Sequence, residues 1–345
     1  MKRLSLIVVA LCAALAVVGC KPQSHYQMKG IIVNTQDLST VDWGKLAAEN
    51  GINTVGTHMF PGEVIEFIQS EKGQAFLASC KEHGVDVEHQ LHAMAELLPR
   101  ELFAEDSTMF RMDENGRRVA DANCCVHSER ALETIAENAV KVAEILRPTN
   151  HRYYFWLDDG KPVCQCEKCR EYTESEQALI IENRIVEALR KQDPEAQLAH
   201  LAYYNSLKAP RKVKPAEGIF LEFAPFYRRW DKPLNDSEAV RDGQTLTHGR
   251  YMEVLKENLE VFPAETAQVL EYWCDVSLVS GWSKPAKKLP WHKDVFLEDI
   301  DTYAKLGIRH ITAYAMYTDA EYYEAYGDVS FVEDYGNGLF RYRKE

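Results

Sequence analysis

The chain has 345 residues, of which 46% are hydrophobic and 27% charged, and these proportions are typical of a globular protein. They exclude a collagen-like, coiled-coil or wholly disordered chain. With 40 basic against 53 acidic residues, the formal net charge is −13, which repels phosphate backbones and anionic lipid headgroups at long range. We therefore expect no nucleic-acid partner.

The first twenty residues have the pattern of an export signal. Lys2 and Arg3 precede an apolar run over 4–18 that is too short to span a bilayer comfortably. The run ends in Val17-Val18-Gly19-Cys20, which resembles the lipobox of bacterial lipoproteins, where the peptidase cuts before a cysteine that then carries the lipids. An ordinary cleaved signal with an incidental Cys20 is the alternative.

The lipobox resemblance implies a signal peptide over 1–19 and a lipidated tether over 20–28. No composition break divides the remainder, so 29–345 is predicted to form one domain. The protein would then be exported and membrane-anchored at Cys20, with the outer membrane or periplasmic face favoured over the cytoplasm. Its partners would be that membrane and the ligand of the domain.

A β/α repeat is indicated by glycines that end helical patterns and are followed at once by β-rich runs, at Gly51, Gly84 and Gly307. Helical patterns over 129–146 and 174–192 carry apolar residues on one face. Eight strands are predicted: 30–35, 52–58, 85–92, 152–158, 197–204, 218–225, 267–273 and 309–315.

Eight strands alternating with helices predict a (β/α)₈ TIM barrel of the α/β class. Residues 206–218, with Pro210 and Pro215, leave no room for a helix between strands five and six. Residues 93–127 form a long insertion after strand three, which the barrel assignment would place on the catalytic face.

The reactive groups of such a barrel project from the carboxyl ends of its strands. Period-two alternation predicts that Glu222 and Glu271 point into the barrel, where an unpaired charge is costly. The side chains at the predicted strand ends are His58, His92, Asp158, Asp159, Tyr204, Asn205, Glu222, Tyr227, Glu271, Trp273, Asp275, Tyr317 and Asp319.

The densest chemical signal is the aromatic strand four, 153–157, followed by Asp158, Asp159 and a glycine. Adjacent carboxyl groups in a desolvated pocket would share a proton, because each raises the pKa of the other. A protonated acid beside a carboxylate is what glycoside cleavage requires. A turn or helix cap is the competing interpretation of this Asp-Asp-Gly.

The barrel layout, this acid pair and the following C-x-C-x-x-C over 164–169 resemble a little-characterised family of bacterial lipoproteins with a glycosidase-type barrel. That barrel is similar to those of β-hexosaminidases, O-GlcNAcases and α-glucuronidases. The resemblance implies that Asp158 orients an acetamido group and that Asp159 is the general acid, although hexosaminidases have Asp-Glu at this place. If two separated carboxylates act instead, we expect Asp159 with Glu222 or Glu271.

Aromatic rings supply the other half of a sugar site, because the apolar faces of sugars stack on them. Most aromatic and histidine side chains of any barrel serve only its core. The residues predicted to bind substrate are His92, Trp156, Tyr204, Asn205, Trp273 and Tyr317.

Seven cysteines remain once Cys12 is removed with the signal and Cys20 is lipidated. Cys164, Cys166 and Cys169, with Cys125 or its neighbour Cys124 as a fourth ligand, suit a tetrahedral structural zinc site. An exported setting favours disulfides instead, and free thiols are the third alternative. No cofactor is expected for catalysis.

The leading hypothesis is an exported, lipid-anchored protein similar to glycoside hydrolases that acts on a glycan, with an N-acetylhexosaminide as the substrate implied by resemblance. A glycan-binding lipoprotein without catalytic activity is the alternative from another functional class. A barrel metallohydrolase using His58 and His92 is a third, disfavoured because no His-x-His pair follows strand one.

Overall fold

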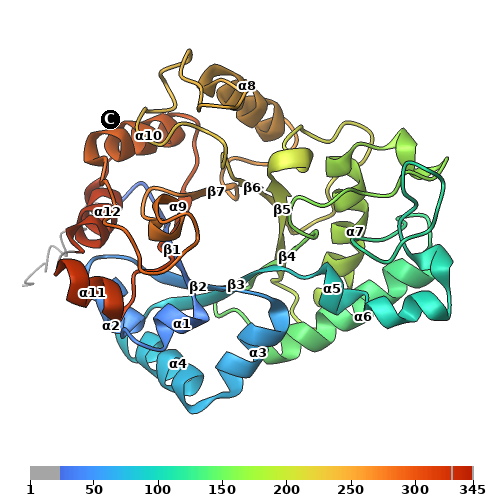
Figure 1. Ribbon diagram of the computed structural model, residues 1–345, viewed down its shortest axis with the longest axis horizontal. Helices are drawn as coiled ribbons and strands as arrows, with labels where there is room; N and C mark the ends of the chain where they lie inside the picture. Colours follow the sequence, from blue (N-terminus) through green and yellow to red (C-terminus); the bar gives the residue numbers. More distant parts are fainter. Residues whose placement is uncertain (1–23, 328, 344–345) are drawn as a thin grey trace, which may run out of the picture.

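The computed structural model describes residues 24–327 and 329–343 as a closed barrel of eight parallel strands that neighbour one another in chain order (Figure 1). The predicted (β/α)₈ TIM barrel is therefore confirmed. The predicted signal peptide and Cys20 lie outside the described residues. Among the helices of the described part, none has the length and apolar character that crossing a membrane requires.

Each of the eight predicted strands overlaps an observed one. The strands are β1 Met28–Asn34, β2 Thr54–His58, β3 Asp86–His92, β4 Arg152–Trp156, β5 Gln197–Ala202, β6 Ile219–Phe223, β7 Gln268–Glu271 and β8 His310–Tyr314.

The helices surround this barrel, and the two long periodic segments form the helices predicted for them, α6 and α7. The α-helices are α1 Thr35–Leu38, α2 Trp43–Glu49, α3 Pro61–Gln69, α4 Glu71–His83, α5 Met94–Leu97, α6 Glu129–Ile145, α7 Glu174–Leu189, α8 His248–Leu259, α9 Val276–Val279, α10 Lys293–Lys305, α11 Ala320–Tyr326 and α12 Ser330–Arg341. The 3₁₀ helices are η1 Arg100–Ala104, η2 Ser107–Met109, η3 Cys169–Glu171 and η4 Tyr204–Ser206.

Local signals in the sequence set the ends of these helices. Gly84 ends α4 in the left-handed conformation, at φ 67°, and β3 begins two residues later. Thr173 and Glu176 form a capping box at the start of α7. Between β5 and β6 the chain forms only η4, as its prolines predicted.

Alternation along the strands divides the buried side chains into two groups. Ile31 and Val33 of β1 pack outward against the helices, whereas Ile32 belongs to the cluster inside the barrel. Tyr154, Phe220 and Leu270 are in the same interior cluster. The barrel is therefore filled by side chains and is not a pore.

A polar network lies inside the barrel among these apolar side chains. The Tyr154 hydroxyl lies 2.9 Å from both Glu88 Oε2 and Gln268 Oε1, which share its single proton as acceptors. Gln268 donates to Glu222 at 2.9 Å and accepts from Arg152 at 3.2 Å. Because each buried carboxylate has donors, the network offsets much of the cost of desolvation.

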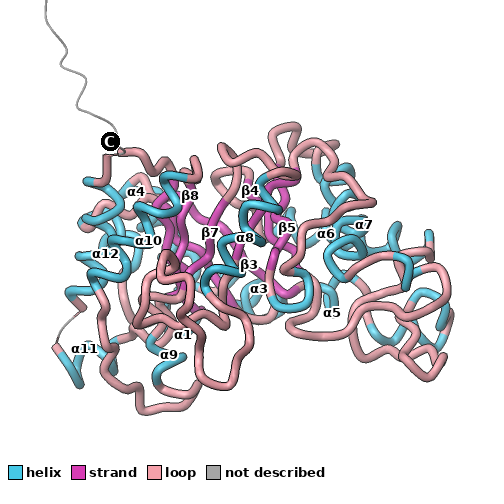
Figure 2. Tube along the Cα trace, turned by 90° about the horizontal axis from the view of Figure 1, so that it is seen from above, coloured by secondary structure: helices cyan, strands magenta, loops and turns pink. Residues whose placement is uncertain are grey.

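The insertion after β3 forms a lobe of loops and short helices beside α6 and α7 (Figures 1 and 2). It contains α5, η1 and η2, and an antiparallel bridge joins Met112 to Arg118. Figure 2 also shows α1, α5, α9 and α11, each of which follows a strand, along the same edge of the molecule. This edge is the carboxyl-terminal face of the barrel.

Candidate active site

A cavity of about 430 Å³ opens at the carboxyl-terminal ends of the strands, where barrel enzymes place their chemistry. Residues from the ends of β1 through β5, β7 and β8 all reach its wall. Its aromatic lining consists of Trp156, Tyr203, Phe226, Tyr272, Trp282, Tyr314 and Tyr317. Such a wall, with few polar groups, is typical of a small-molecule or sugar site.

Two carboxylates line this cavity, from loops three strands apart in the barrel ring. Asp159 follows β4, and its side chain is 63% exposed. Asp275 follows β7, is 5% exposed, and caps α9 by accepting from the Ser277 backbone at 3.0 Å and hydroxyl at 2.6 Å. The cavity thus holds one solvated and one buried carboxyl group.

The surroundings of Asp275 change its titration. Burial raises the pKa of Asp275 to about 6, although the hydrogen bonds from Ser277 act in the opposite direction. Burial raises the pKa of the Tyr314 hydroxyl, and nearby carboxylates, which include Asp275 and Asp159, raise the pKa of this hydroxyl further. Asp275 is therefore substantially protonated in mildly acidic solution, and a protonated carboxyl group can donate a proton.

Two histidines stand beside the carboxylates. His58 Nδ1 lies 2.7 Å from the Gln90 carbonyl, and His92 Nδ1 lies 2.6 Å from the Leu157 carbonyl. A carbonyl only accepts, so Nδ1 carries the proton in each ring and the neutral ring presents Nε2 as an acceptor. Burial lowers the pKa of both, for His58 to about 4, so both rings are neutral near pH 7.

His92 also approaches the acid that follows β4. Its Nε2 lies 3.9 Å from Asp159 Oδ1, which is beyond direct hydrogen-bond range. A neutral Nε2 can accept from a ligand hydroxyl placed between these groups.

Asp158 does not face this cavity, and the expected desolvated pair is not formed. Its Oδ2 accepts from the Arg100 guanidinium and from the Asn123 backbone, at 2.6 Å in each case. Its own backbone N–H donates to the Asn123 side chain at 3.0 Å. Asp158 therefore fastens the insertion to the β4 loop, and its charge partner is an arginine, not the neighbouring acid.

The structure separates the two glutamates that were expected to point inward. Glu222 does point into the barrel, as predicted, but it is fully buried and accepts from Trp156 Nε1 and Gln268 Nε2 at 2.9 Å. It does not line the cavity, whose wall includes Trp156.

The prediction for Glu271 was wrong. Leu270 and Tyr272 line the cavity, so Glu271 points out of the barrel on the opposite face of β7. There its Oε1 accepts from Arg228 at 2.8 Å and from Tyr303 of α10 at 2.5 Å. The outward orientation is tolerated because Glu271 accepts from a buried guanidinium, which Asp299 shares, and from the Tyr303 hydroxyl.

Of the predicted substrate-binding residues, His92, Trp156 and Tyr317 line the cavity. Tyr204 and Asn205 line a smaller adjacent hollow, together with Asp158. Trp273 lies in a second cavity, with its indole N–H donated to Asp299 at 2.9 Å.

Asp275 was among the acids at the strand ends but not among the predicted site residues, and it is the principal omission. The signal for it was an Asp-x-Ser cap in the loop that follows β7.

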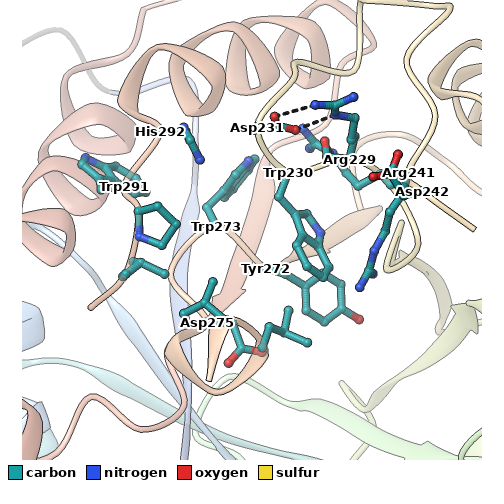
Figure 3. Close-up of a pocket in the computed structure, with 15 residues that line it drawn as sticks. Arg229, Trp230, Asp231, Arg241, Asp242, Tyr272, Trp273, Asp275, Trp291 and His292 are labelled. Carbon is teal, nitrogen blue, oxygen red and sulfur yellow. Dashed lines mark hydrogen bonds and ion pairs between the residues drawn. The ribbon is translucent and has the colours of Figure 1, made fainter. Parts of the chain in front are cut away.

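The second cavity, of about 360 Å³, adjoins the first and shares Tyr272, Asp275 and Leu278 with it. Figure 3 shows Arg229 paired with Asp231 on its wall, through two contacts of 2.8 Å. The Arg241 guanidinium lies 4.3 Å above the Trp230 ring. Asp275 therefore lines both of these adjoining cavities.

Comparison with known proteins identifies the family. Residues 57–328 match the model described as Domain of unknown function (DUF4838), which covers more than half of the chain. The chain belongs to this family. A search of curated proteins gives no match.

Several solved structures with a similar fold are glycoside hydrolases. A tri-modular endo-β-1,4-glucanase from Bacillus licheniformis, complexed with cellotetraose, has a TM-score of 0.54 and 11% identity, with 91% of this chain and 60% of that chain covered. An endo-β-mannanase/endo-β-glucanase from Prevotella bryantii has a TM-score of 0.53 and 13% identity, with 92% of this chain and 49% of that chain covered. A β-galactosidase from Marinomonas ef1 has a TM-score of 0.51 and 13% identity, with 83% of this chain and 54% of that chain covered. At these identities the likeness establishes a barrel like those of glycoside hydrolases.

Proposed function

We propose that the protein hydrolyses glycosidic bonds in the cavity at the carboxyl-terminal face of its barrel. The observation that carries the proposal is the pair of carboxylates, Asp159 and Asp275, on different strand ends of one aromatic cavity. Glycoside cleavage needs one protonated and one ionised carboxyl group, and unequal burial provides this division.

The roles follow from the surroundings of each group. Asp275 is buried with a raised pKa, so it is the general acid that protonates the leaving oxygen. Asp159, solvated at the opposite wall, is the carboxylate that acts on the anomeric carbon, directly or through water. His58 and His92, as neutral acceptors, would bind sugar hydroxyls, and the rings would stack on sugar faces.

The expected substrate class follows from the sizes of the two adjoining cavities. Two adjoining hollows of about 430 and 360 Å³ provide space for more than one sugar ring, which favours an oligosaccharide. An N-acetylhexosaminide remains one substrate class to test. Asp158 is held by Arg100 away from the cavity, so we do not assign it the role of orienting an acetamido group.

The test is a hydrolysis screen with aryl N-acetylhexosaminides, aryl β-glycosides and cello-oligosaccharides. Asp159→Asn and Asp275→Asn should each reduce kcat about 10²- to 10⁴-fold on any substrate that the wild type cleaves. Glu298→Gln is the matched control: it changes an exposed carboxyl group of α10 that lines neither cavity and should retain full turnover. Full activity in both aspartate variants would reject the assignment.

A glycan-binding protein without turnover is the second candidate. It is favoured by the 63% exposure of Asp159, since a catalytic carboxylate is usually more desolvated. This function predicts saturable glycan binding that Asp159→Asn leaves unchanged, and no hydrolysis of any substrate in the screen.

We also propose that the chain is exported and anchored to a membrane by lipid on Cys20. The support is the lipobox-like sequence over 17–20 after a short apolar run. Labelling with a fatty acid in bacterial cells should modify the wild type and not Cys20→Ser. Equal labelling of both would contradict the anchor.

A further inference from the structure

We propose that Cys125, Cys164, Cys166 and Cys169 bind one structural zinc ion behind the β4 loop. All four side chains are buried, and their sulfur atoms lie within 4.8 Å of one another. They come from two parts of the chain, the insertion after β3 and the loop between β4 and α7. Within the described residues this is the one group of metal-ligating side chains that meets in this way.

The distances fit a tetrahedral ion coordinated by four thiolates. Zinc–sulfur bonds of about 2.3 Å in a tetrahedron place the sulfur atoms about 3.8 Å apart. Cys125 Sγ lies 3.8 Å from Cys169 Sγ and 3.9 Å from Cys166 Sγ. A disulfide bond would need about 2.05 Å, and none of the four cysteines is joined to another by a disulfide bond in the structure.

The position of the cysteines also selects between the two candidates for the fourth ligand. Cys125 belongs to the cluster, whereas its neighbour Cys124 is buried and lies outside it. Four thiolates close the coordination sphere and leave no open position for substrate or water, so the ion would serve the structure and not catalysis.

Groups around the cluster are arranged to support thiolates. The Met112 backbone N–H donates to Cys164 Sγ at 3.3 Å, and the Arg118 guanidinium lies 3.8 Å from the same sulfur. The buried amide of Gln177 on α7 donates to the carbonyls of Cys164 and Cys169, at 3.1 Å in each case. These contacts fix the ligand loop and offset its negative charge, as the outer shell of a metal site does.

The ion would tie the insertion to the loop that carries the candidate catalytic acid. Two residues before Cys125, the Asn123 side chain donates to the Pro162 carbonyl at 3.0 Å and accepts from the Asp158 backbone N–H. The Asn123 backbone N–H donates to the Asp158 carboxylate. Asp159 is the next residue. The cysteines are therefore positioning residues that act on Asp159 through the two joined loops, without contacting the cavity.

The first test is the metal content of the full chain purified without chelator or reducing agent. Native mass spectrometry and elemental analysis should find one zinc ion per chain. Exchange of zinc for cobalt should give the visible spectrum of a tetrahedral tetrathiolate site, which a protein with free thiols or disulfides would lack. A metal-free chain with its four thiols paired as disulfides, or all reactive, would overturn the proposal.

Variants identify the ligands. Cys125→Ser should reduce zinc affinity at least 10-fold in competition with a coloured chelator, and Gln177→Ala about 10–100-fold, because it removes an outer-shell contact. Cys124→Ser, a neighbouring buried cysteine outside the cluster, should keep the full metal content. If Cys125→Ser fails to fold, the cobalt spectrum of the wild type still shows whether four thiolates bind the metal.

The positioning role has its own readout. Zinc removal should accelerate proteolytic cleavage within 93–127 before the barrel unfolds globally, since the insertion loses its attachment. If a hydrolysed substrate is found, zinc loss should lower kcat more than it raises KM. Failure of every glycosidase screen would leave the metal content unaffected, so the two proposals fail separately.

Discussion

At the scale of single residues, the general-acid role proposed for the buried carboxyl group of Asp275 predicts how turnover depends on pH. The acid form must donate the proton, and the pKa of this group is raised to about 6 by burial. We predict that kcat/KM falls as pH rises through about 6, approaching tenfold per unit. A pH–rate profile checks this; a flat profile from pH 5 to 8 would contradict the role.

Asp37 is a second buried acid, and it holds the loop that carries Tyr317. Its Oδ2 accepts from the Tyr317 backbone N–H at 2.6 Å, and burial raises its pKa to about 7. Between pH 4 and 7 the folded state therefore binds more protons than the unfolded state. The contribution of Asp37 to the free energy of unfolding is therefore lost as pH rises through this range.

Asp37→Asn keeps an acceptor for the Tyr317 N–H and removes the titration. We predict that the variant gains about 2 kcal/mol of unfolding free energy relative to the wild type between pH 5 and pH 8. Denaturant unfolding at both values measures the difference. A difference between variant and wild type that does not change with pH would show that Asp37 does not titrate in this range.

At the scale of elements, three aromatic residues of the rim loops adopt left-handed backbone conformations that favour glycine. They are Tyr204, Trp282 and Tyr317, at φ 45°, 53° and 67°. Such strain costs of order 1 kcal/mol or more at each residue and is retained most often at functional sites. We interpret these rings as held in place for ligand, since a core would not require the strain.

Trp282 offers the clearest test, because its side chain is 61% exposed and contributes little to the core. Trp282→Gly should leave stability unchanged or raise it by about 1 kcal/mol, while glycan affinity falls by roughly the 1 kcal/mol or more of a stacked ring. Thermal unfolding and glycan-binding titrations measure both effects. Lower stability with unchanged binding would mean that the ring serves the fold.

The strands and main helices were predictable because capping glycines and alternating side chains are local signals. The orientation of β7 was not, since Leu270 and Glu271 alternate with equal regularity in either phase. What decides the phase is Arg228, a buried cation from another loop that lies 2.8 Å from Glu271. Asp158 was misplaced for the same reason: its partner Arg100 is 58 residues away in the chain.

At the scale of the whole molecule, the polar network inside the barrel and the candidate site lie in separate parts of the structure. Its interior is closed by the network around Glu88 and Glu222, and its carboxyl-terminal face carries the cavity. The sequence could place acids at strand ends, but it could not tell which of them share one cavity. That depends on how eight strand ends and a 35-residue insertion over 93–127 converge in space.

The response of the whole molecule to acid combines opposing groups. Burial lowers the pKa of His89 to about 3 and that of His310 likewise to about 3, so unfolding lets them take up protons and stability is lost as pH falls below about 6.5. Asp37 and Asp275, with raised values, oppose this loss. The slope of unfolding free energy against pH in the wild type therefore reports only the sum of these opposing contributions.

A single variant isolates one side of that balance. His89→Gln can retain a hydrogen bond to Thr57, whose hydroxyl lies 2.8 Å from the imidazole, while removing a group that charges on unfolding. Between pH 6.5 and 4 the variant should lose less stability than the wild type, by up to about 1.4 kcal/mol per pH unit. Urea unfolding across this range measures both slopes. If unfolding free energy depends on pH equally in the variant and the wild type, His89 binds its proton equally well in the folded and unfolded states. That result would contradict a pKa lowered by burial.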